Sequence, residues 1–180
     1  MSNNIVLLAG SPRAGANSDK LAEAFKNGAE AAGKHFKLFR VADMKIGSCI
    51  GCQSCLKNKG ACFKKDDMQE IIEAIRVADA VVFASPIYFF AISAQLKLAI
   101  DRTYALLKED IKVKRCALLL TCADHKNDEA EAGAVLSYQK MVSYKKWENA
   151  GIVVVTEVND KNDIIGRPEL EDAYNLGRRI

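Results

Sequence analysis

Short apolar runs alternate with amphipathic segments along the whole chain, and this alternation constrains the fold more than any other feature. The apolar runs that read as strands are residues 4–10, 36–44, 80–86, 115–123 and 151–158. The helical patterns between and after them are residues 17–33, 66–78, 93–107, 127–149 and a segment after Pro168. Apolar strands separated by helices favour a parallel sheet that is covered on both faces and joined by right-handed crossovers. We therefore predict an α/β, doubly wound sandwich that forms a single domain over residues 1–180.

The first helical segment carries signals for both of its ends. Leu21, Phe25 and Ala29 recur at helical spacing, which predicts one buried face. Asn17 or Ser18 can cap the start, and Gly33 can end the helix. We therefore expect the turn between the first strand and this helix to be short and well defined.

Composition excludes several classes of function. A chain of 180 residues can bury one sizeable core, and 49% hydrophobic with 27% charged residues is ordinary for a globular protein. A net charge of +3 is too small for a dedicated nucleic-acid binder, so we expect no nucleic-acid partner. No stretch approaches the roughly eighteen apolar residues of a membrane span, so we expect no membrane partner and a cytoplasmic location.

The loop "GSPRAGANS", residues 10 to 18, joins the first strand to the first helix. In doubly wound sheets, ligands bind outside the carboxyl ends of the strands, where this loop lies. Free backbone amides, the helix dipole and the side chains of Ser11, Arg13, Asn17 and Ser18 together suit a single phosphate. The loop lacks G-x-G-x-x-G and the Walker lysine, which disfavours a dinucleotide or a triphosphate. A plain strand-to-helix turn capped by Asn17 is the alternative.

A second loop, "SPIYFFAIS", follows the third predicted strand. Pro86 keeps the chain extended before three consecutive aromatic residues, Tyr88, Phe89 and Phe90. A planar ring system could lie against this backbone and these side chains. The alternative is that the aromatic residues form a lid over the core.

Four of the six cysteines lie close together in "SCIGCQSCLKNKGACF", residues 48 to 63: Cys49, Cys52, Cys55 and Cys62. Clustered cysteines in a reducing cytosol more often bind metal or do redox chemistry than form disulfides. Three thiolates at three-residue intervals can wrap three corners of a [4Fe-4S] cluster, and the fourth completes the ligand set. Zinc is the second choice because it prefers widely separated pairs of cysteines. A disulfide and a reduced loop without metal remain open.

Three segments together resemble a known family. "LLAGSPRAGANSDKLAEAF", the cysteine loop running into "DDMQEI", and "ASPIYFFAISAQLKLAIDRT" are similar to the signature regions of the NADPH-dependent FMN reductase group of the flavodoxin superfamily. The likeness is strongest to its iron-sulfur flavoproteins and covers roughly residues 5 to 122. It implies a flavodoxin-like three-layer sandwich with a five-stranded parallel sheet in the strand order 2-1-3-4-5.

The resemblance also implies which residues bind the cofactors. By position, Ser11, Arg13, Asn17 and Ser18 would bind the FMN phosphate, and Pro86, Ile87, Tyr88 and Phe89 would lie along the isoalloxazine ring. Thr121, Cys122 and Ala123 follow the fourth predicted strand and would form a third flavin-side loop. The cysteine loop, which follows the second strand, would place its cluster at the same sheet edge, beside the flavin. Similar proteins are homodimers or homotetramers with the flavin near a subunit interface.

We therefore expect an FMN-dependent oxidoreductase that passes electrons from NAD(P)H, or from a ferredoxin-like protein, through FMN to a small-molecule or protein acceptor. Because the flavin itself carries the reaction, we assign no catalytic residue. A non-enzymatic electron carrier or a flavin-responsive binding protein is the alternative from a different functional class.

Overall fold

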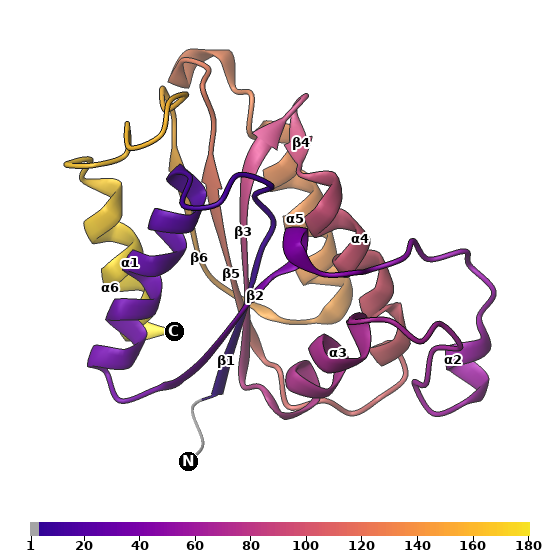
Figure 1. Ribbon diagram of the computed structural model, residues 1–180. Coiled ribbons are helices and arrows are strands. Elements are labelled where there is room, and N and C mark those ends of the chain that lie inside the picture. The colour runs from indigo at the N-terminus through magenta and orange to yellow at the C-terminus, as the bar shows by residue number, and fades with distance from the viewer. Residues whose placement is uncertain (1–3) are drawn as a thin grey trace.

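The computed structural model describes residues 4–180, in which five parallel strands form the central layer (Figure 1). These strands are β1 (Asn4–Ala9), β2 (His35–Arg40), β3 (Ala80–Tyr88), β5 (Arg115–Thr121) and β6 (Glu148–Val155). Their order across the sheet is β2-β1-β3-β5-β6. A two-residue strand that the sequence did not indicate, β4 (Ala91–Ile92), pairs antiparallel with the end of β3. Without β4 the order is 2-1-3-4-5, so the expected flavodoxin-like topology is confirmed.

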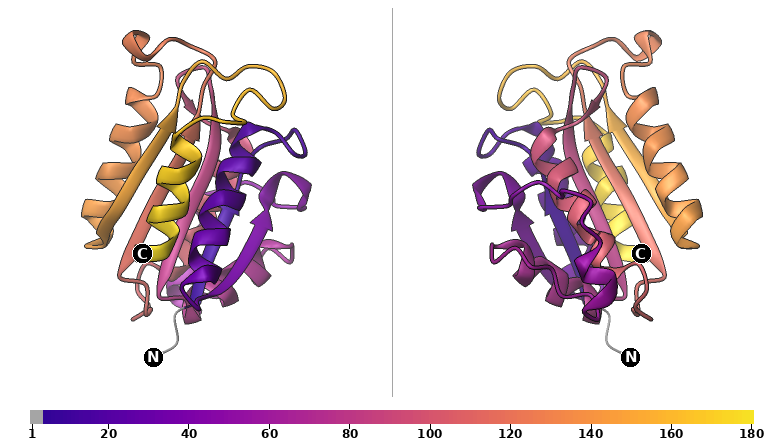
Figure 2. Two further views of the ribbon diagram at one scale, coloured as in Figure 1. Left: turned by 90° about the vertical axis from the view of Figure 1, so that its left-hand side faces the viewer. Right: turned by 90° about the vertical axis from the view of Figure 1, so that its right-hand side faces the viewer.

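Helices cover both faces of the sheet (Figures 1 and 2). One face carries α1 (Asn17–Ala31) and α6 (Glu169–Arg179), and the other carries α3 (Met68–Val77), α4 (Ala94–Arg102) and α5 (Ala132–Lys145). Successive side chains of a strand point to opposite faces. Leu7 of β1 accordingly packs with the α1 and α6 side chains, whereas Leu8 packs with those of α3 and α4. Both faces of the sheet are therefore buried, as the apolar runs predicted.

Shorter elements lie in the connections. They are the short helix α2 (Ser54–Lys57) and the 3-10 helices η1 (Val41–Asp43), η2 (Thr103–Leu106) and η3 (Lys126–Asp128). The expected strand 36–44 therefore ends at Arg40, and the expected helix 93–107 becomes 3-10 after Arg102. The expected helix 127–149 was also too long, because Lys146 adopts a positive φ of 55° and Glu148 already pairs with β5.

The first helix begins differently from the sequence prediction. Its N-cap residue is Ala16, which has no side chain that could cap the helix, so the predicted cap at Asn17 or Ser18 is wrong. Both residues are instead buried in the first turn of α1. Gly33 does follow the end of the helix, with a φ of +73° that suits glycine. The first amides of α1 are thus left without a side-chain partner.

Two glycines let α1 and α6 approach each other closely. A Cβ atom on Gly28 would overlap the carbonyl oxygen of Tyr174 and lie 2.7 Å from its carbonyl carbon. A Cβ atom on Gly177 would overlap the carbonyl oxygen of Phe25 in the same way. The backbones of the first and the last helix are therefore in direct contact.

None of the helices in residues 4–180 is both long enough and apolar enough to span a bilayer.

Candidate functional site

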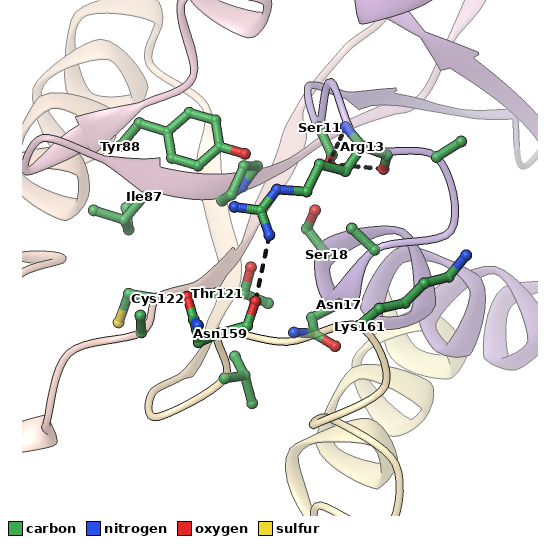
Figure 3. Close-up of a pocket in the computed structure, with 15 residues that line it drawn as sticks. Ser11, Arg13, Asn17, Ser18, Ile87, Tyr88, Thr121, Cys122, Asn159 and Lys161 are labelled. Atoms are coloured by element: carbon green, nitrogen blue, oxygen red, sulfur yellow. Dashed lines mark hydrogen bonds between the residues drawn. The ribbon is translucent and has the colours of Figure 1, made fainter.

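A cavity of about 260 Å³ opens at the carboxyl ends of β1, β3, β5 and β6 (Figure 3). It lies where ligands bind in doubly wound sheets. Ten of the eleven residues that the resemblance assigned to flavin binding line it: Ser11, Arg13, Asn17, Ser18, Pro86, Ile87, Tyr88, Thr121, Cys122 and Ala123. The remaining one, Phe89, does not line this cavity. The structure therefore brings the two predicted flavin loops together around one space.

The loop after β1 forms a polar wall of this cavity. The Ser11 hydroxyl accepts a hydrogen bond from the Arg13 N–H at 3.2 Å and donates to the Arg13 carbonyl at 3.0 Å, which fixes the turn. Ser18 is 2% exposed, and its hydroxyl has no hydrogen-bond partner in the part of the chain that the structure describes. A buried hydroxyl without a partner is costly, and the uncapped N-terminus of α1 is electropositive. The wall is thus suited to an anion that accepts hydrogen bonds.

Asn17 lines the cavity and also joins two segments of its wall. Its amide nitrogen donates to the Asp160 carbonyl at 2.9 Å, and its side-chain oxygen accepts from the Ile164 N–H at 3.4 Å. The Asn17 side chain therefore ties the start of α1 to the loop between β6 and α6. Asn17 thereby positions the cavity wall, through one hydrogen bond that its side chain donates and one that it accepts.

The loop after β6 adds polar residues that the sequence analysis missed. Asn159 and Lys161 both line the cavity, and the Arg13 guanidinium donates to the Asn159 carbonyl at 3.4 Å (Figure 3). Lys161 lies against the turn at Gly15, because a Cβ atom built there would be 3.5 Å from Nζ. The rule that ligands bind at carboxyl ends of strands could have drawn attention to this loop, but the family resemblance did not reach it.

The loop after β3 forms the apolar wall and then turns sharply. Ile87 pairs with Ile92 and Tyr88 with Ala91, so Phe89 and Phe90 are the two residues of a tight turn. Their φ angles are +50° and +64°, in the left-handed region that suits Asn or Gly in such turns. Phe89 is 97% exposed at the tip of the turn. Pro86, Ile87 and Tyr88 therefore line the cavity, while Phe89 points away from the core.

Two buried serines connect the two flavin loops beneath the cavity. The Ser93 hydroxyl, at the N-cap of α4, donates to the Gly10 carbonyl at 2.7 Å. The Ser85 hydroxyl accepts from the Ser93 N–H at 2.9 Å. A Cβ atom on Gly10 would lie 2.6 Å from the Cβ of Leu96, so only glycine fits there. These contacts fix the loop after β1 (residues 10–18, here called the phosphate loop) relative to the loop after β3 (residues 85–93, the aromatic loop).

The thiol of Cys122 lies beside Thr121 at the base of the cavity and is 3% exposed. Burial, followed by the charges of Glu131 and Asp124, raises the pKa of this thiol to about 11. Cys122 is therefore protonated at neutral pH and is a poor nucleophile. Cys116 is also buried, where the Tyr138 hydroxyl donates to its sulfur at 3.3 Å. Both cysteines are core residues, as free cysteine commonly is.

The other four cysteines form a separate site. Cys49, Cys52, Cys55 and Cys62 are free thiols that line one small cavity together with Arg102. This cavity lies beside the C-terminal end of α4 and η2, whereas the N-terminal end of α4 contacts the phosphate loop (Figure 1). The expectation that the cysteines share a sheet edge with the flavin loops is therefore wrong within one chain. After η1 the chain turns back along α3 and α4 instead of staying above the strands.

Ion pairs hold both ends of the cysteine loop. Near its start, the Gly47 N–H donates to Asp66 at 3.0 Å, and the Gly47 carbonyl accepts from Arg102 at 2.8 Å. Near its end, Gly60 packs against the ion pair between Arg76 and Glu109, whose Nε and Oε2 atoms are 2.7 Å apart. Between these points, a Cβ atom on Gly51 would meet no atom within 4 Å. The loop is thus held at both ends, and its middle is open at Gly51.

Arg102 is the buried cation of this site, with a side chain that is 2% exposed. Burial lowers the pKa of Arg102, but the hydrogen bonds and charges of Asp66 and Cys62 outweigh that effect and raise the net pKa. Its two terminal nitrogens bind Asp66 at 2.7 and 2.9 Å. Its Nε atom is buried and has no hydrogen-bond partner among residues 4–180. The Nε–H is therefore an unused donor of a side chain that lines the cysteine cavity.

The donor set, four free thiols on one loop, is the ligand type that iron-sulfur clusters use. Within residues 4–180, no three Cys, His, Asp or Glu side chains lie close enough together to bind one metal ion. A zinc ion requires such convergence, with all its ligands within bonding distance of one point. An iron-sulfur cluster is also held by thiolates, and the described residues do not form a preassembled group for it.

Comparisons with known proteins agree with this architecture. The sequence model of the family described as NADPH-dependent FMN reductase matches residues 3–150. A solved NAD(P)H:quinone oxidoreductase from Methanothermobacter marburgensis superposes with a TM-score of 0.79 at 19% identity, covering 99% of this chain and 96% of that one. An azoreductase from Bacillus anthracis gives a TM-score of 0.75 at 19% identity, with 100% of each chain covered. At these identities the likeness establishes the fold alone.

Curated relatives carry a more specific name. An iron-sulfur flavoprotein of Archaeoglobus fulgidus is 39% identical over 93 residues, which are 52% of this chain and 42% of that protein. One from Methanocaldococcus jannaschii is 35% identical over 99 residues, 55% of this chain and 51% of that protein. The chain thus spans about half the length of these two relatives. One from Methanosarcina thermophila is 27% identical over 171 residues, 94% of this chain and 85% of that protein.

Proposed function

We propose that this chain, which belongs to the NADPH-dependent FMN reductase family, is an FMN-dependent oxidoreductase that takes electrons from NAD(P)H and passes them to a small-molecule or protein acceptor. FMN, when bound, supplies the redox chemistry by accepting hydride and releasing electrons one or two at a time. The protein supplies binding, orientation and electrostatics.

The observation that carries this proposal is the pairing of an anion-binding wall with an apolar wall in one cavity. Ser18 offers a buried hydroxyl without a partner, while Arg13 and Lys161 bring two cations to the N-terminus of α1. These groups suit the terminal phosphate of FMN. Opposite them, Ile87 and Tyr88 offer a surface on which a flat ring system can stack. A phosphate joined to a planar ring is the chemistry of FMN.

The remaining residues of the cavity position the flavin without reacting. Because Cys122 is buried with a raised pKa, it adds bulk at the base of the cavity but no thiolate there. Asn17 holds the β6–α6 loop against α1, and Ser93 holds the phosphate loop against α4. Substrate specificity then depends on the open side of the cavity, beside the exposed turn at Phe89 and Phe90.

We also propose that Cys49, Cys52, Cys55 and Cys62 hold an iron-sulfur cluster. The free thiols around one cavity and the names of the curated relatives support this proposal. Such a group exchanges single electrons, and Lys57 and Lys59 on the same loop would favour an acidic, ferredoxin-like partner.

Anaerobic purification followed by FMN reconstitution tests both parts of the proposal. We expect flavin absorbance bands, oxidation of NADPH or NADH when an acceptor is added, and iron with sulfide on chemical analysis. Absence of flavin binding would refute the proposed function. A bound flavin that a nicotinamide cannot reduce, but a protein donor can, would identify a non-enzymatic electron carrier instead.

The Lys161→Gln variant tests the contribution of the β6–α6 loop. Because the Lys161 ammonium would face the FMN phosphate from the solvent side, we expect FMN affinity to fall roughly two- to fivefold, the range of an exposed ion pair. The affinity for riboflavin, which has no phosphate, should not change. Fluorescence titration of both ligands measures this difference, and an equal loss for both would place Lys161 elsewhere on the flavin.

A further inference from the structure

The buried guanidinium of Arg102 is more than an anchor for the cysteine loop. We propose, building on the function proposed above, that Arg102 is a positioning residue for the cluster, with its free Nε–H donating to sulfur at the corner formed by Cys62.

The three nitrogens of the Arg102 guanidinium differ in their hydrogen-bond partners. Nη1 bridges the Gly47 carbonyl and Asp66, at 2.8 and 2.7 Å, and Nη2 binds the second oxygen of Asp66 at 2.9 Å. This bidentate pair with an added backbone contact fixes the plane and the direction of the guanidinium. The position of Nε is therefore set before any ligand arrives.

The Nε–H of Arg102 is a buried donor that lacks an acceptor within residues 4–180. The Arg102 side chain is 2% exposed, and its Nε atom has no partner among the described residues. A buried donor of a charged group that is left without a partner is costly, so its retention calls for an acceptor. Arg102 lines the same cavity as the four cysteines, and Cys62 is the cysteine whose charge and hydrogen bonding act on it.

The positive charge of Arg102 would also act on the reduction potential of the cluster. Four thiolates and an iron-sulfur core carry net negative charge, which increases when the cluster gains an electron. Hydrogen bonds to the sulfurs and a nearby cation stabilise the reduced form and raise the reduction potential. Arg102 is suited to this role because a guanidinium stays protonated at any working pH.

The chain offers a matched comparison for this role. Arg76 forms the other clamp of the same loop, with Glu109 beside Gly60, but it does not line the cysteine cavity. Changing either arginine to lysine weakens one clamp of the loop. Only Arg102 also lines the cysteine cavity, so only its replacement changes a guanidinium beside the thiols.

The test uses the full chain reconstituted anaerobically with FMN, iron and sulfide. Wild type, Arg102→Lys, Arg102→Met and Arg76→Lys are compared for melting temperature, flavin content, iron and sulfide content, and cluster midpoint potential. For Arg102→Lys we expect the reduced cluster to lose about tenfold in relative stability, a fall of about 59 mV for one electron. For Arg102→Met we expect a severalfold loss of iron with the flavin retained. Arg76→Lys should keep the wild-type potential.

Two results with the variants would overturn the inference. One is an unchanged potential in Arg102→Lys, and the other is an equal shift in Arg76→Lys, which would reduce Arg102 to a loop clamp. If Arg102→Met fails to fold, the midpoint potential of Arg102→Lys still tests whether Arg102 acts on the cluster. A wild-type protein that binds FMN but no iron would also refute this inference while leaving the flavin function standing.

Discussion

Replacing Gly28 by alanine is expected to lower the free energy of unfolding by about 3 kcal/mol, the upper range for overpacking a close contact. For a chain of this size that corresponds to a fall in melting temperature of about 6 to 12 °C. The added Cβ would overlap the Tyr174 carbonyl, and neither helix backbone can move aside without disturbing the sheet. Thermal and denaturant unfolding of the apo protein would measure the loss.

Helix propensity alone would predict the opposite sign for the change in the free energy of unfolding. In an unpacked helix, glycine to alanine gains about 1 kcal/mol. Asn27→Ala is the matched control, because Asn27 is the exposed neighbour of Gly28 in the same helix. It should raise stability by about 0.5 kcal/mol. If Gly28→Ala were as stable as Asn27→Ala, the close approach of α1 and α6 would be refuted.

Replacing Ser18 by alanine is expected to separate stability from cofactor binding. The hydroxyl is buried without a partner in the apo protein, so its removal should stabilise the apo form by about 1 kcal/mol. The same hydroxyl would donate to the FMN phosphate, and hydrogen bonds to charged groups contribute about 1.5–3 kcal/mol. FMN affinity should therefore fall roughly tenfold to a hundredfold.

Denaturant unfolding of the apo protein and flavin fluorescence titration measure the two effects. Riboflavin affinity should stay at the wild-type value, because riboflavin lacks the phosphate. Ser143→Ala, at an exposed position of α5, should leave FMN affinity unchanged and raise stability only by the roughly 0.5 kcal/mol that helix propensity contributes. An unchanged FMN affinity in Ser18→Ala would mean that the phosphate binds elsewhere.

Much of the fold was predictable because burial on both faces leaves a clear pattern. Strands β1, β3 and β5 are continuous apolar runs, and each was recognised. The tight turn at Phe89 and Phe90 was not, because two phenylalanines carry no signal for positive φ. Pairing of β3 with β4 imposes that conformation on them. Long-range pairing here overrides local preference.

The candidate site was predictable in part for a similar reason. Residues next to apolar strands, such as Ser11 and Tyr88, could be placed because the strands could be placed. Lys161 was missed because the resemblance, which pointed to the other loops, ends before the strand that Lys161 follows. The position of the cysteine loop was mistaken because it depends on Arg102 and Asp66, whose pairing across the fold has no local signature.

The contact between α1 and α6 also has a consequence for the order of events during synthesis. Domains begin to form while the chain is still being made, from the N-terminal end. The phosphate loop is encoded first, but α1 is seated by the backbone of α6, and Asn17 is tied to Asp160. A nascent chain that has not yet released residues 169–179 from the ribosome therefore has the flavin-binding residues but no rigid pocket. We expect FMN to be captured only after residues 169–179 have left the ribosome and packed against α1.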